Sequence, residues 1–371
     1  MQQSRCFFAS RWGPVVAGLV IGVVAAVLAR LGNPANMGLC VVCFARDTAG
    51  ALGLHRAAPV QYIRPELLGL VLGALATALV SREFRPRTGS APLVRFVLGF
   101  FAAAGALVFL GCPWRAFLRL SGGDLNALVG LAGLAGGIVL GVLFLRRGFT
   151  LGPNRPAPYA SGWVAAISAA GLLGLLLWSP QFGREAQGQP TGPIFASPSG
   201  TPGGQHAPLL VSLAAGLVIG SLAQRSRFCT VGGIRDVVLM RDPHLLNGAL
   251  ALMGAALGAN LALGQFRLGF ADQPVAHTEH LWNFAGMALA GLAFTLAGGC
   301  PGRQLVLAGE GDGDSALFFL GIVSGSACAH LFSFASGPKS TGPYGPAVVI
   351  AGLLVCVLLG LTMREPGKTG G

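Results

Sequence analysis

Charged residues are scarce in this sequence of 371 residues: they make up 10% of it, and only 13 are Asp or Glu. An ordinary soluble domain carries roughly 25% charged residues. Hydrophobic residues make up 53% of the chain, and the mean hydropathy is +0.68. A water-soluble protein could not cover this much apolar surface, so the composition indicates a membrane protein.

Motifs of several enzyme classes are also missing. The sequence has no Gly-rich P-loop that could cradle a nucleotide phosphate, which argues against ATP-driven transport by this chain alone. It has no Gly-x-Ser-x-Gly elbow and no nucleophilic triad either. We therefore predict a protein that is not an enzyme and that needs no cofactor.

The cysteine and histidine patterns do not predict a metal site. Eight cysteines in so long and apolar a chain are not a disulfide framework. Cys40 and Cys43 form one Cys-x-x-Cys, which supplies only two of the roughly four ligands of a structural zinc. His277 and His280 flank Glu279, and we expect them in a solvated loop.

Ten apolar runs approach or reach the ~17–25 residues that cross a bilayer. They are Pro14–Arg30, Glu66–Val80, Leu93–Leu110, Ala127–Leu145, Gly162–Trp178, Pro208–Leu222, Leu246–Leu263, Phe284–Gly298, Ser315–Phe332 and Pro346–Met363. The predicted fold class is an all-α polytopic membrane protein with about ten transmembrane helices. The first run is expected to be a retained span rather than a cleaved signal peptide.

The basic residues lie in short connections between the apolar runs, where Lys and Arg set orientation in a membrane. With the N-terminus inside, 16 of the 25 Lys and Arg residues fall on the inner side and 8 on the outer side. We therefore predict a protein of the cytoplasmic membrane with both termini in the cytoplasm. The net charge of +12 is explained by this distribution and does not indicate nucleic-acid binding.

Two cysteine motifs occur twice. Segment Leu39–Asp47 matches Phe228–Asp236, because both read apolar residue, Cys, x, Val, and end in Arg-Asp. Segment Gly111–Arg115 matches Gly299–Arg303, because both read Gly-Cys-Pro-x-Arg. Each Gly-Cys-Pro motif is followed, twelve residues after its Cys, by the Asp of a Gly-Asp pair. The chain therefore contains an internal repeat.

The spacing of the motifs supports the repeat. Cys112 follows Cys40 by 72 residues, and Cys300 follows Cys229 by 71. Four spans and the linking helix Gly162–Trp178 precede the second copy, so that copy enters the membrane in the opposite direction. Inverted repeats with sites near the midplane are common in secondary transporters. The predicted divisions are a first repeat at 1–150, a linking helix and Gly/Pro-rich outer linker at 151–207, and a second repeat plus C-terminal helix at 208–371. Within the linker, Ser179–Ala207 is rich in Gly, Pro, Gln and Ser, which predicts a mobile segment outside the membrane.

The four repeated cysteines are predicted to lie in re-entrant loops. Pro is favourable at the first position of a helix, so Cys112 and Cys300 should begin half-helices, where free N–H groups and the helix dipole favour an anion or a thiolate. Cys40 and Cys229 should begin similar short helices, approaching from the outer and the inner side. The expected supporting residues are Cys43, Arg46, Asp47, Pro113, Arg115, Arg235, Asp236, Pro301 and Arg303. The Arg-Asp pairs are expected either to anchor the loops at the membrane interface or to orient an anion.

These motifs resemble the YeeE/YedE family of sulfur-compound transporters. Segments Asn33–Asp47 and Gly122–Asn126 are similar to the YedE branch described as putative selenium transporters. The resemblance implies that a thiosulfate-like anion or a selenium species is passed along Cys40, Cys112, Cys229 and Cys300 by S–H hydrogen bonds. It also implies a TusA-like sulfur carrier as a cytoplasmic partner.

Three hypotheses about function remain open from the sequence. The first is a transporter for a small sulfur- or selenium-containing solute. The second is a membrane-embedded thiol or persulfide redox enzyme that uses Cys40 and Cys43. The third is a structural membrane protein in which every cysteine can be replaced without effect.

Overall fold

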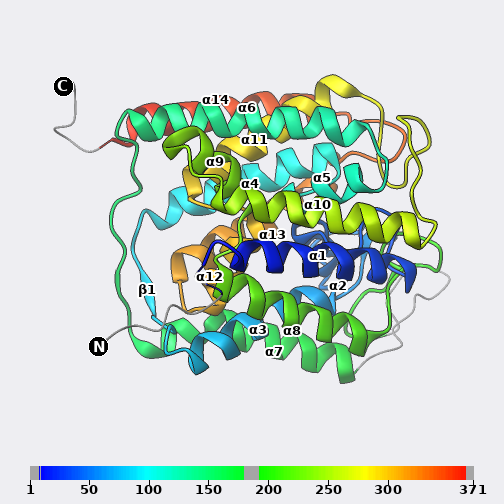
Figure 1. Ribbon diagram of the computed structural model, residues 1–371, viewed down its shortest axis with the longest axis horizontal. Coiled ribbons are helices and arrows are strands. Elements are labelled where there is room, and N and C mark those ends of the chain that lie inside the picture. Colours follow the sequence, from blue (N-terminus) through cyan, green and yellow to red (C-terminus); the bar gives the residue numbers. More distant parts are fainter. Residues whose placement is uncertain (1–7, 9, 179–191, 365–371) are drawn as a thin grey trace.

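The computed structural model describes residues 8, 10–178 and 192–364, and the regular secondary structure of these residues is almost entirely helical (Figure 1). The first part forms α1 (Gly13–Arg30), α2 (Val41–Ala51), the 3-10 turn η2 (Ala58–Val60), α3 (Pro65–Val80), β1 (Arg87–Thr88), α4 (Pro92–Phe109), α5 (Pro113–Ser121) and α6 (Asn126–Arg146). The middle forms β2 (Arg155–Pro156), the 3-10 turn η3 (Tyr159–Trp163) and α7 (Val164–Trp178). The rest forms α8 (Leu209–Ser226), α9 (Thr230–Met240), α10 (His244–Ala262), α11 (His280–Ala297), α12 (Pro301–Gly309), α13 (Gly313–Leu331) and α14 (Gly345–Thr362).

Ten helical segments in the described residues are long and apolar enough to cross a bilayer. They are Gly13–Arg30, Ala58–Val80, Pro92–Ser121, Asn126–Arg146, Tyr159–Trp178, Leu209–Met240, His244–Ala262, His280–Gly309, Gly313–Leu331 and Gly345–Thr362. Each overlaps one of the ten runs predicted from the sequence, so the predicted number of spans is confirmed. Three of these segments are broken helices, in which α4, α8 and α11 are followed by the short helices α5, α9 and α12.

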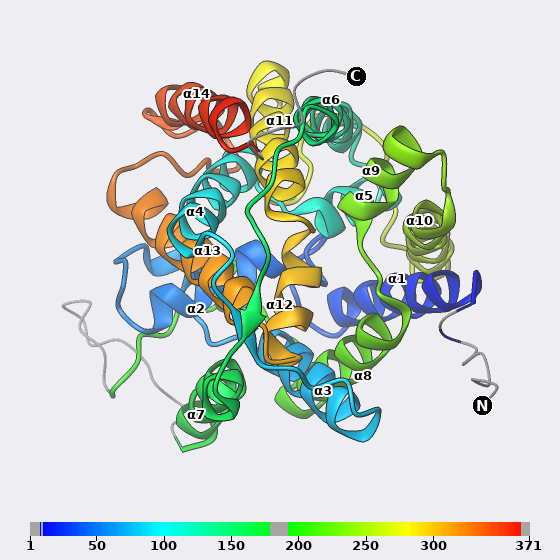
Figure 2. The same cartoon turned by 90° about the vertical axis from the view of Figure 1, so that its left-hand side faces the viewer.

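The most extensive helix contacts join the two halves of the chain to each other. Helix α1 packs against α10, and α8 packs against α3 (Figure 2). Helix α4 packs against α13, and α11 packs against α6. Helices α1 and α8 hold the same place in the two sequence repeats, and so do α3 and α10. The α1–α10 contact is therefore the counterpart of the α8–α3 contact. The same relation joins the α4–α13 pair to the α11–α6 pair.

Corresponding helices run in opposite directions. The backbone N–H of Ala207, just before α8, donates to Asn33 Oδ1, just after α1, over 2.8 Å. The end of α1 and the start of α8 therefore lie on the same side of the molecule, while the two helices pack against each other. This arrangement confirms the prediction of two inverted repeats.

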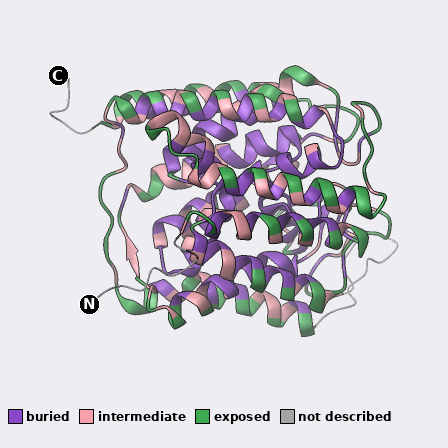
Figure 3. Cartoon of the chain, viewed as in Figure 1, coloured by how far each residue is buried: buried purple, intermediate pink, exposed green. Residues whose placement is uncertain are grey.

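The two ends of the helix bundle are named here by the cysteine loop that each carries. The Cys40 side holds the segments 31–40, 122–125, 192–208 and 263–279 (right in Figure 1). The Cys229 side holds 81–91, 147–163 and 310–312, where β1 pairs antiparallel with β2 in the register Arg87 to Pro156. Buried residues gather in the short helices at the centre, and exposed ones lie on the outer faces of the long helices (Figure 3).

The Gly/Pro-rich stretch Ser179–Ala207 was expected to be a mobile linker. Its first part, 179–191, lies outside the described residues. Its second part packs against the Cys40 side: Ile194 and Phe195 are buried, and Arg64 donates to the carbonyls of Pro202 and Gln205. For residues 192–207 the expectation of a mobile linker is therefore wrong, because a buried arginine binds their backbone.

Glycine lets the paired helices approach to backbone contact, as is common in lipid. A Cβ built on Gly248 of α10 would lie 2.7 Å from the carbonyl oxygen of Pro14 in α1. A Cβ on Gly254, further along α10, would meet nothing within 4 Å. Backbone atoms cannot move aside as a flexible side chain can, so only the first position excludes a larger residue.

We therefore expect Gly248→Ala to destabilise the protein by about 1–3 kcal/mol, the usual cost of overpacking. Gly254→Ala on the same helix is the matched control and should leave the melting temperature unchanged or slightly higher. Thermal unfolding of the two purified variants in detergent measures the difference. Equal melting temperatures would contradict the close α1–α10 contact.

Candidate functional site

The Gly-Cys-Pro motifs break two long helices at matching places. Leu110 and Gly298 adopt left-handed backbone conformations, with φ of 65° and 93°, and end α4 and α11. Cys112 and Cys300 follow in extended conformation as the N-caps of α5 and α12. Pro113 and Pro301 then occupy the first helical position. The structure therefore places Cys112 and Cys300 at the N-terminal ends of half-helices, as the sequence predicts.

The other two cysteines cap α2 and α9 in the same way. Cys40 Sγ accepts the N–H of Cys43 over 3.4 Å, and Cys229 Sγ accepts the N–H of Gly232 over 3.2 Å. Both thiols are buried, at 0% and 5% exposure. Every residue of α2 is also buried, so this short helix lies inside the protein.

Backbone hydrogen bonds join the four cysteines into two pairs. The N–H of Cys112 donates to Cys40 Sγ over 3.5 Å, and the N–H of Cys300 donates to Cys229 Sγ over 3.3 Å. Within each pair, two helix N-termini meet at one sulfur atom. Such ends carry free N–H groups and partial positive charge, which favour an anion. Each repeat therefore contributes one buried, sulfur-lined point with a preference for negative charge.

Arg115 adds a positive charge near the Cys40–Cys112 pair. Its side chain is fully buried, and none of the ion pairs in the described part of the chain includes it. The guanidinium donates to the carbonyls of Asn36 and Leu110, and its Nη1 atom lies 3.6 Å from Cys43 Sγ. Carbonyl groups orient the guanidinium but do not neutralise its charge.

Arg303, the counterpart of Arg115 in the second repeat, is neutralised. Its Nη1 atom lies 3.1 Å from Glu310 Oε1, and Arg227 binds the same carboxylate over 2.9 Å. The two cysteine pairs are therefore alike in backbone geometry and different in local charge. Only the Cys40 side has a buried arginine at this motif position without a carboxylate.

The Arg-Asp pairs form the ion pairs that their spacing suggests. Asp47 binds both Arg46 and Arg64, over 2.7 and 2.8 Å, and all three side chains are at most 3% exposed. Asp236 binds Arg235 over 2.8 Å and is less deeply buried. The first pair lies in the protein interior, and its second arginine comes from the start of α3, so these ion pairs join α2 to α3.

A further buried ion pair was not predicted from the sequence. Arg119 of α5 binds Asp124 over 2.6 Å, and both side chains are fully buried. The same guanidinium lies 4.2 Å from the ring centroid of Phe109 and donates to the Phe109 carbonyl. These contacts hold α5 against the end of α4. They therefore fix the angle between the two helices at the break that contains Cys112.

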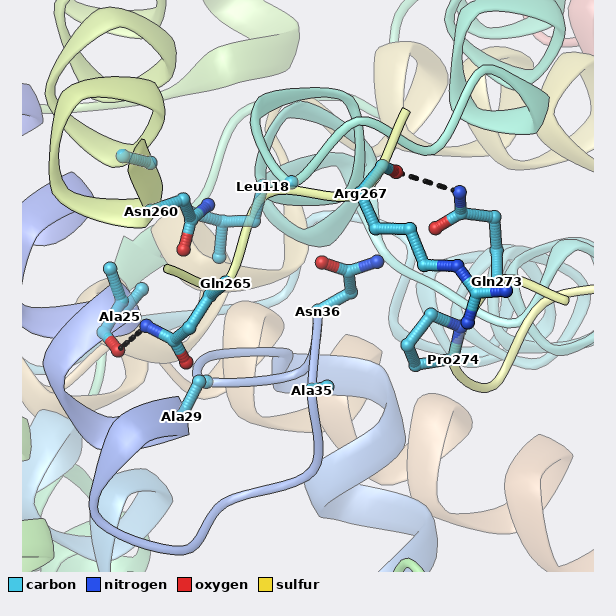
Figure 4. Close-up of a pocket in the computed structure, with 14 residues that line it drawn as sticks. Ala25, Ala29, Ala35, Asn36, Leu118, Asn260, Gln265, Arg267, Gln273 and Pro274 are labelled. Carbon is cyan, nitrogen blue, oxygen red and sulfur yellow. Dashed lines mark hydrogen bonds between the residues drawn. The ribbon is translucent and has the colours of Figure 1, made fainter. Parts of the chain in front are cut away.

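A cavity of about 140 Å³ opens on the Cys40 side between α1, α5 and α10 (Figure 4). Its polar lining residues are Asn36, Asn260, Gln265, Arg267 and Gln273. None of the four paired cysteines lines it. The link to them is through Asn36, whose carbonyl oxygen accepts Arg115 Nε over 3.0 Å. The cavity therefore lies next to the loop segment that binds Arg115.

No group of three or more His, Cys, Asp or Glu side chains in the described ranges could hold a metal ion. Cys40 and Cys43 are both free thiols rather than a disulfide. The paired cysteine loops offer thiols, backbone N–H groups and a buried guanidinium, a set of groups that suits a small anion.

Two buried histidines stabilise the loops of the Cys40 side. His277 Nε2 lies 2.8 Å from the Val108 carbonyl, and His55 Nε2 lies 3.0 Å from the Arg46 carbonyl. In each ring Nδ1 accepts the backbone N–H two residues later, so Nε2 carries the proton. The expectation of a solvated loop is wrong for His277, which is 2% exposed, because its ring caps the end of α4.

Burial lowers the pKa of both His55 and His277 below the ordinary value of 6.5. The unfolded chain therefore binds more protons than the folded one as the pH falls below about 6.5, and stability declines from there towards the lower folded pKa. We expect the variant His55→Gln/His277→Gln to lose less thermal stability between about pH 7.5 and about pH 5.5 than the wild type, since neutral glutamines can replace the neutral rings. Parallel pH profiles for the two proteins would contradict this.

Comparison with known proteins agrees with the chemistry of the site. A protein family described as sulphur transport matches the chain at residues 2–144 and 225–363. The first matched segment contains Cys40 and Cys112, and the second contains Cys229 and Cys300. The thiosulfate transporter TsuA of Escherichia coli (strain K12) is 30% identical over 103 residues, which is 28% of this chain and 29% of the length of TsuA.

Proposed function

The chain belongs to the sulphur transport family, and from this membership we propose that it carries a small sulfur-containing anion such as thiosulfate across the membrane. The substrate would pass along Cys40, Cys112, Cys229 and Cys300. The observation that carries the proposal is the pairing of these cysteines, in which each repeat joins two helix N-termini at one buried sulfur. Irregular backbone at membrane depth is tolerated where it is buried in protein or lines a pathway.

The charges favour binding on the Cys40 side. Arg115 is buried there without a carboxylate, whereas Arg303 shares Glu310 with Arg227. An anion that reaches the Cys40–Cys112 pair would neutralise the Arg115 guanidinium and accept hydrogen bonds from the thiols. The cavity beside Asn36, with the exposed Arg267 in its lining, is the proposed entrance to this pair.

A selenium species is an alternative cargo of the same chemistry. Selenium and sulfur oxyanions have similar shape and charge, and the thiols and N–H groups of this site would bind either. The surplus of basic residues on the Cys229 side supports a cytoplasmic location of that side and of both termini. A TusA-like sulfur carrier would then receive the solute there.

Uptake of radiolabelled thiosulfate by proteoliposomes tests the proposed function. We expect saturable uptake that unlabelled thiosulfate inhibits, and competition with sulfite, selenite and selenate ranks the alternative cargoes. Protein-free liposomes are the control. Uptake no faster than in that control, for thiosulfate and for every competitor tested as a labelled solute, would refute the proposal.

One contact favours a second function, a thiol redox enzyme based on Cys40 and Cys43. Arg115 Nη1 lies 3.6 Å from Cys43 Sγ. The hydrogen bond with Cys40 and burial raise the pKa of the Cys43 thiol above its ordinary value, and the nearby guanidinium acts in the opposite direction, towards the thiolate. The second repeat has Gly232 in the place of Cys43, so such chemistry would be confined to one half. The enzyme hypothesis requires turnover by detergent-solubilised protein and its loss in Cys43→Ser, whereas a transporter needs sealed vesicles.

A further inference from the structure

The two Gly-Cys-Pro-x-Arg motifs differ at their variable position. The first has Trp114 there, and the second has Gly302. The backbones around these residues match, since each is the second residue of a half-helix that begins at a proline. The same position therefore carries the largest side chain in the first repeat and no side chain in the second.

The structure shows why one of the two positions must be a glycine. The six-membered ring of Trp114 occupies the place where a Cβ on Gly302 would project, with Cη2 at 2.9 Å from it. Phe228 packs on the same indole in a T-shaped arrangement, with ring centroids 5.7 Å apart. Phe228 directly precedes Cys229, and Gly302 lies two residues after Cys300. The indole therefore fills the contact between the Cys40–Cys112 pair and the Cys229–Cys300 pair.

The polar atom of this indole has no partner. Trp114 is fully buried, and its Nε1 atom makes no hydrogen bond. Buried tryptophan N–H groups are usually bonded, and an unsatisfied donor in the interior is unfavourable. An oxyanion between the cysteine pairs would supply the acceptor that the indole lacks.

We propose that Trp114 is the central gate of the pathway: its ring separates the two cysteine pairs, and its Nε1–H donates to an oxygen of the passing anion. This inference rests on the proposed function and adds the residue that selects for oxygen-bearing solutes. The ring must move from Gly302 for a solute to pass, and the hydrogen bond formed at that moment favours thiosulfate over a solute without an acceptor oxygen.

Thiol labelling tests the barrier without requiring transport. A protein that keeps Cys300 as its single cysteine is treated with a membrane-impermeant methanethiosulfonate reagent in right-side-out and in inverted vesicles. With Trp114 present, we expect the reagent to modify Cys300 from one face of the membrane at most. In the Trp114→Gly protein, we expect it to modify Cys300 from both faces. Trp178→Gly, at an exposed position of α7, is the matched control and should behave like the parent. Unchanged labelling in a monodisperse Trp114→Gly protein would overturn the gate, even if the protein transports thiosulfate.

Trp114→Phe tests the hydrogen bond from Nε1. It also provides a test of the proposal if the Trp114→Gly protein does not fold. Phenylalanine keeps an aromatic barrier but has no N–H. We expect labelling as in the parent and a KM for thiosulfate raised at least about fivefold, the effect of losing one hydrogen bond to an anion. An unchanged KM would overturn the donor role. Failure of the wild type to transport any sulfur or selenium anion would refute the proposed function instead, while the labelling result would still decide whether Trp114 is a barrier.

Discussion

Replacing Cys300 by alanine is expected to reduce thiosulfate uptake by about tenfold or more, a loss of about 1.4 kcal/mol or more of stabilisation along the path. Cys300 begins α12, and its own N–H binds Cys229 Sγ, so its thiol belongs to the point where two helix N-termini meet. Alanine keeps the backbone N–H groups and removes only the sulfur. Initial rates of labelled thiosulfate uptake by proteoliposomes measure the effect.

Cys356→Ala is the matched control for this experiment. Cys356 is also fully buried, but it lies in α14, away from the repeated loops, and the repeat gives it no counterpart. We expect its uptake rate to stay close to that of the wild type. A Cys300→Ala protein that transports as fast as Cys356→Ala would show that the thiol is structural.

Neutralising Arg115 is expected to weaken solute binding more than neutralising its counterpart. Two unit charges about 5–8 Å apart interact by about 2–3 kcal/mol at an effective dielectric constant of about 20, which corresponds to a tenfold or greater change in affinity. Arg115→Gln should therefore raise the KM for thiosulfate about tenfold or more, since the buried charge of Arg115 is not shared with a carboxylate. Arg115→Lys keeps the charge and should recover part of the affinity.

Arg303→Gln is the control that the repeat provides. The charge of Arg303 is already neutralised by Glu310 in the wild type, and in the variant Arg227 would remain bound to that carboxylate. We expect a much smaller change in KM for this variant. Equal increases in KM for Arg115→Gln and Arg303→Gln would contradict the idea that the Cys40 side holds the uncompensated charge.

The sequence predicts the fold well because its signals are local or repeated. Apolar runs give the ten spans, and matched spacing of Cys40 with Cys112 and of Cys229 with Cys300 gives the inverted halves. Proline after cysteine gives the half-helices, because a helix that starts with Pro needs no hydrogen bond at that position. What these signals do not contain is which helices pack together, and the cross-pairing of α1 with α10 and α3 with α8 appears only in three dimensions.

The sequence is less informative about the partners of the buried charges. Arg64 binds Asp47 across seventeen residues, and Glu310 binds Arg227 across eighty-three, so neither pair has a local signature. The pair Arg119–Asp124 had one available signal: Asp124 belongs to the repeated Gly-Asp motif, and an aspartate buried in a membrane protein needs a basic partner. Trp114 stands at the position where the two repeats differ, so the residues shared by the repeats give no signal for it.

Two complementary cysteine variants test the central claim most directly. One keeps only the paired cysteines Cys40, Cys112, Cys229 and Cys300; the other keeps only Cys6, Cys43, Cys328 and Cys356. Both are purified, reconstituted at equal density and assayed for thiosulfate uptake. We expect the first to transport at a rate close to the wild type and the second to fall to the level of protein-free liposomes. Substantial uptake by the second protein would show that the paired thiols do not form the pathway.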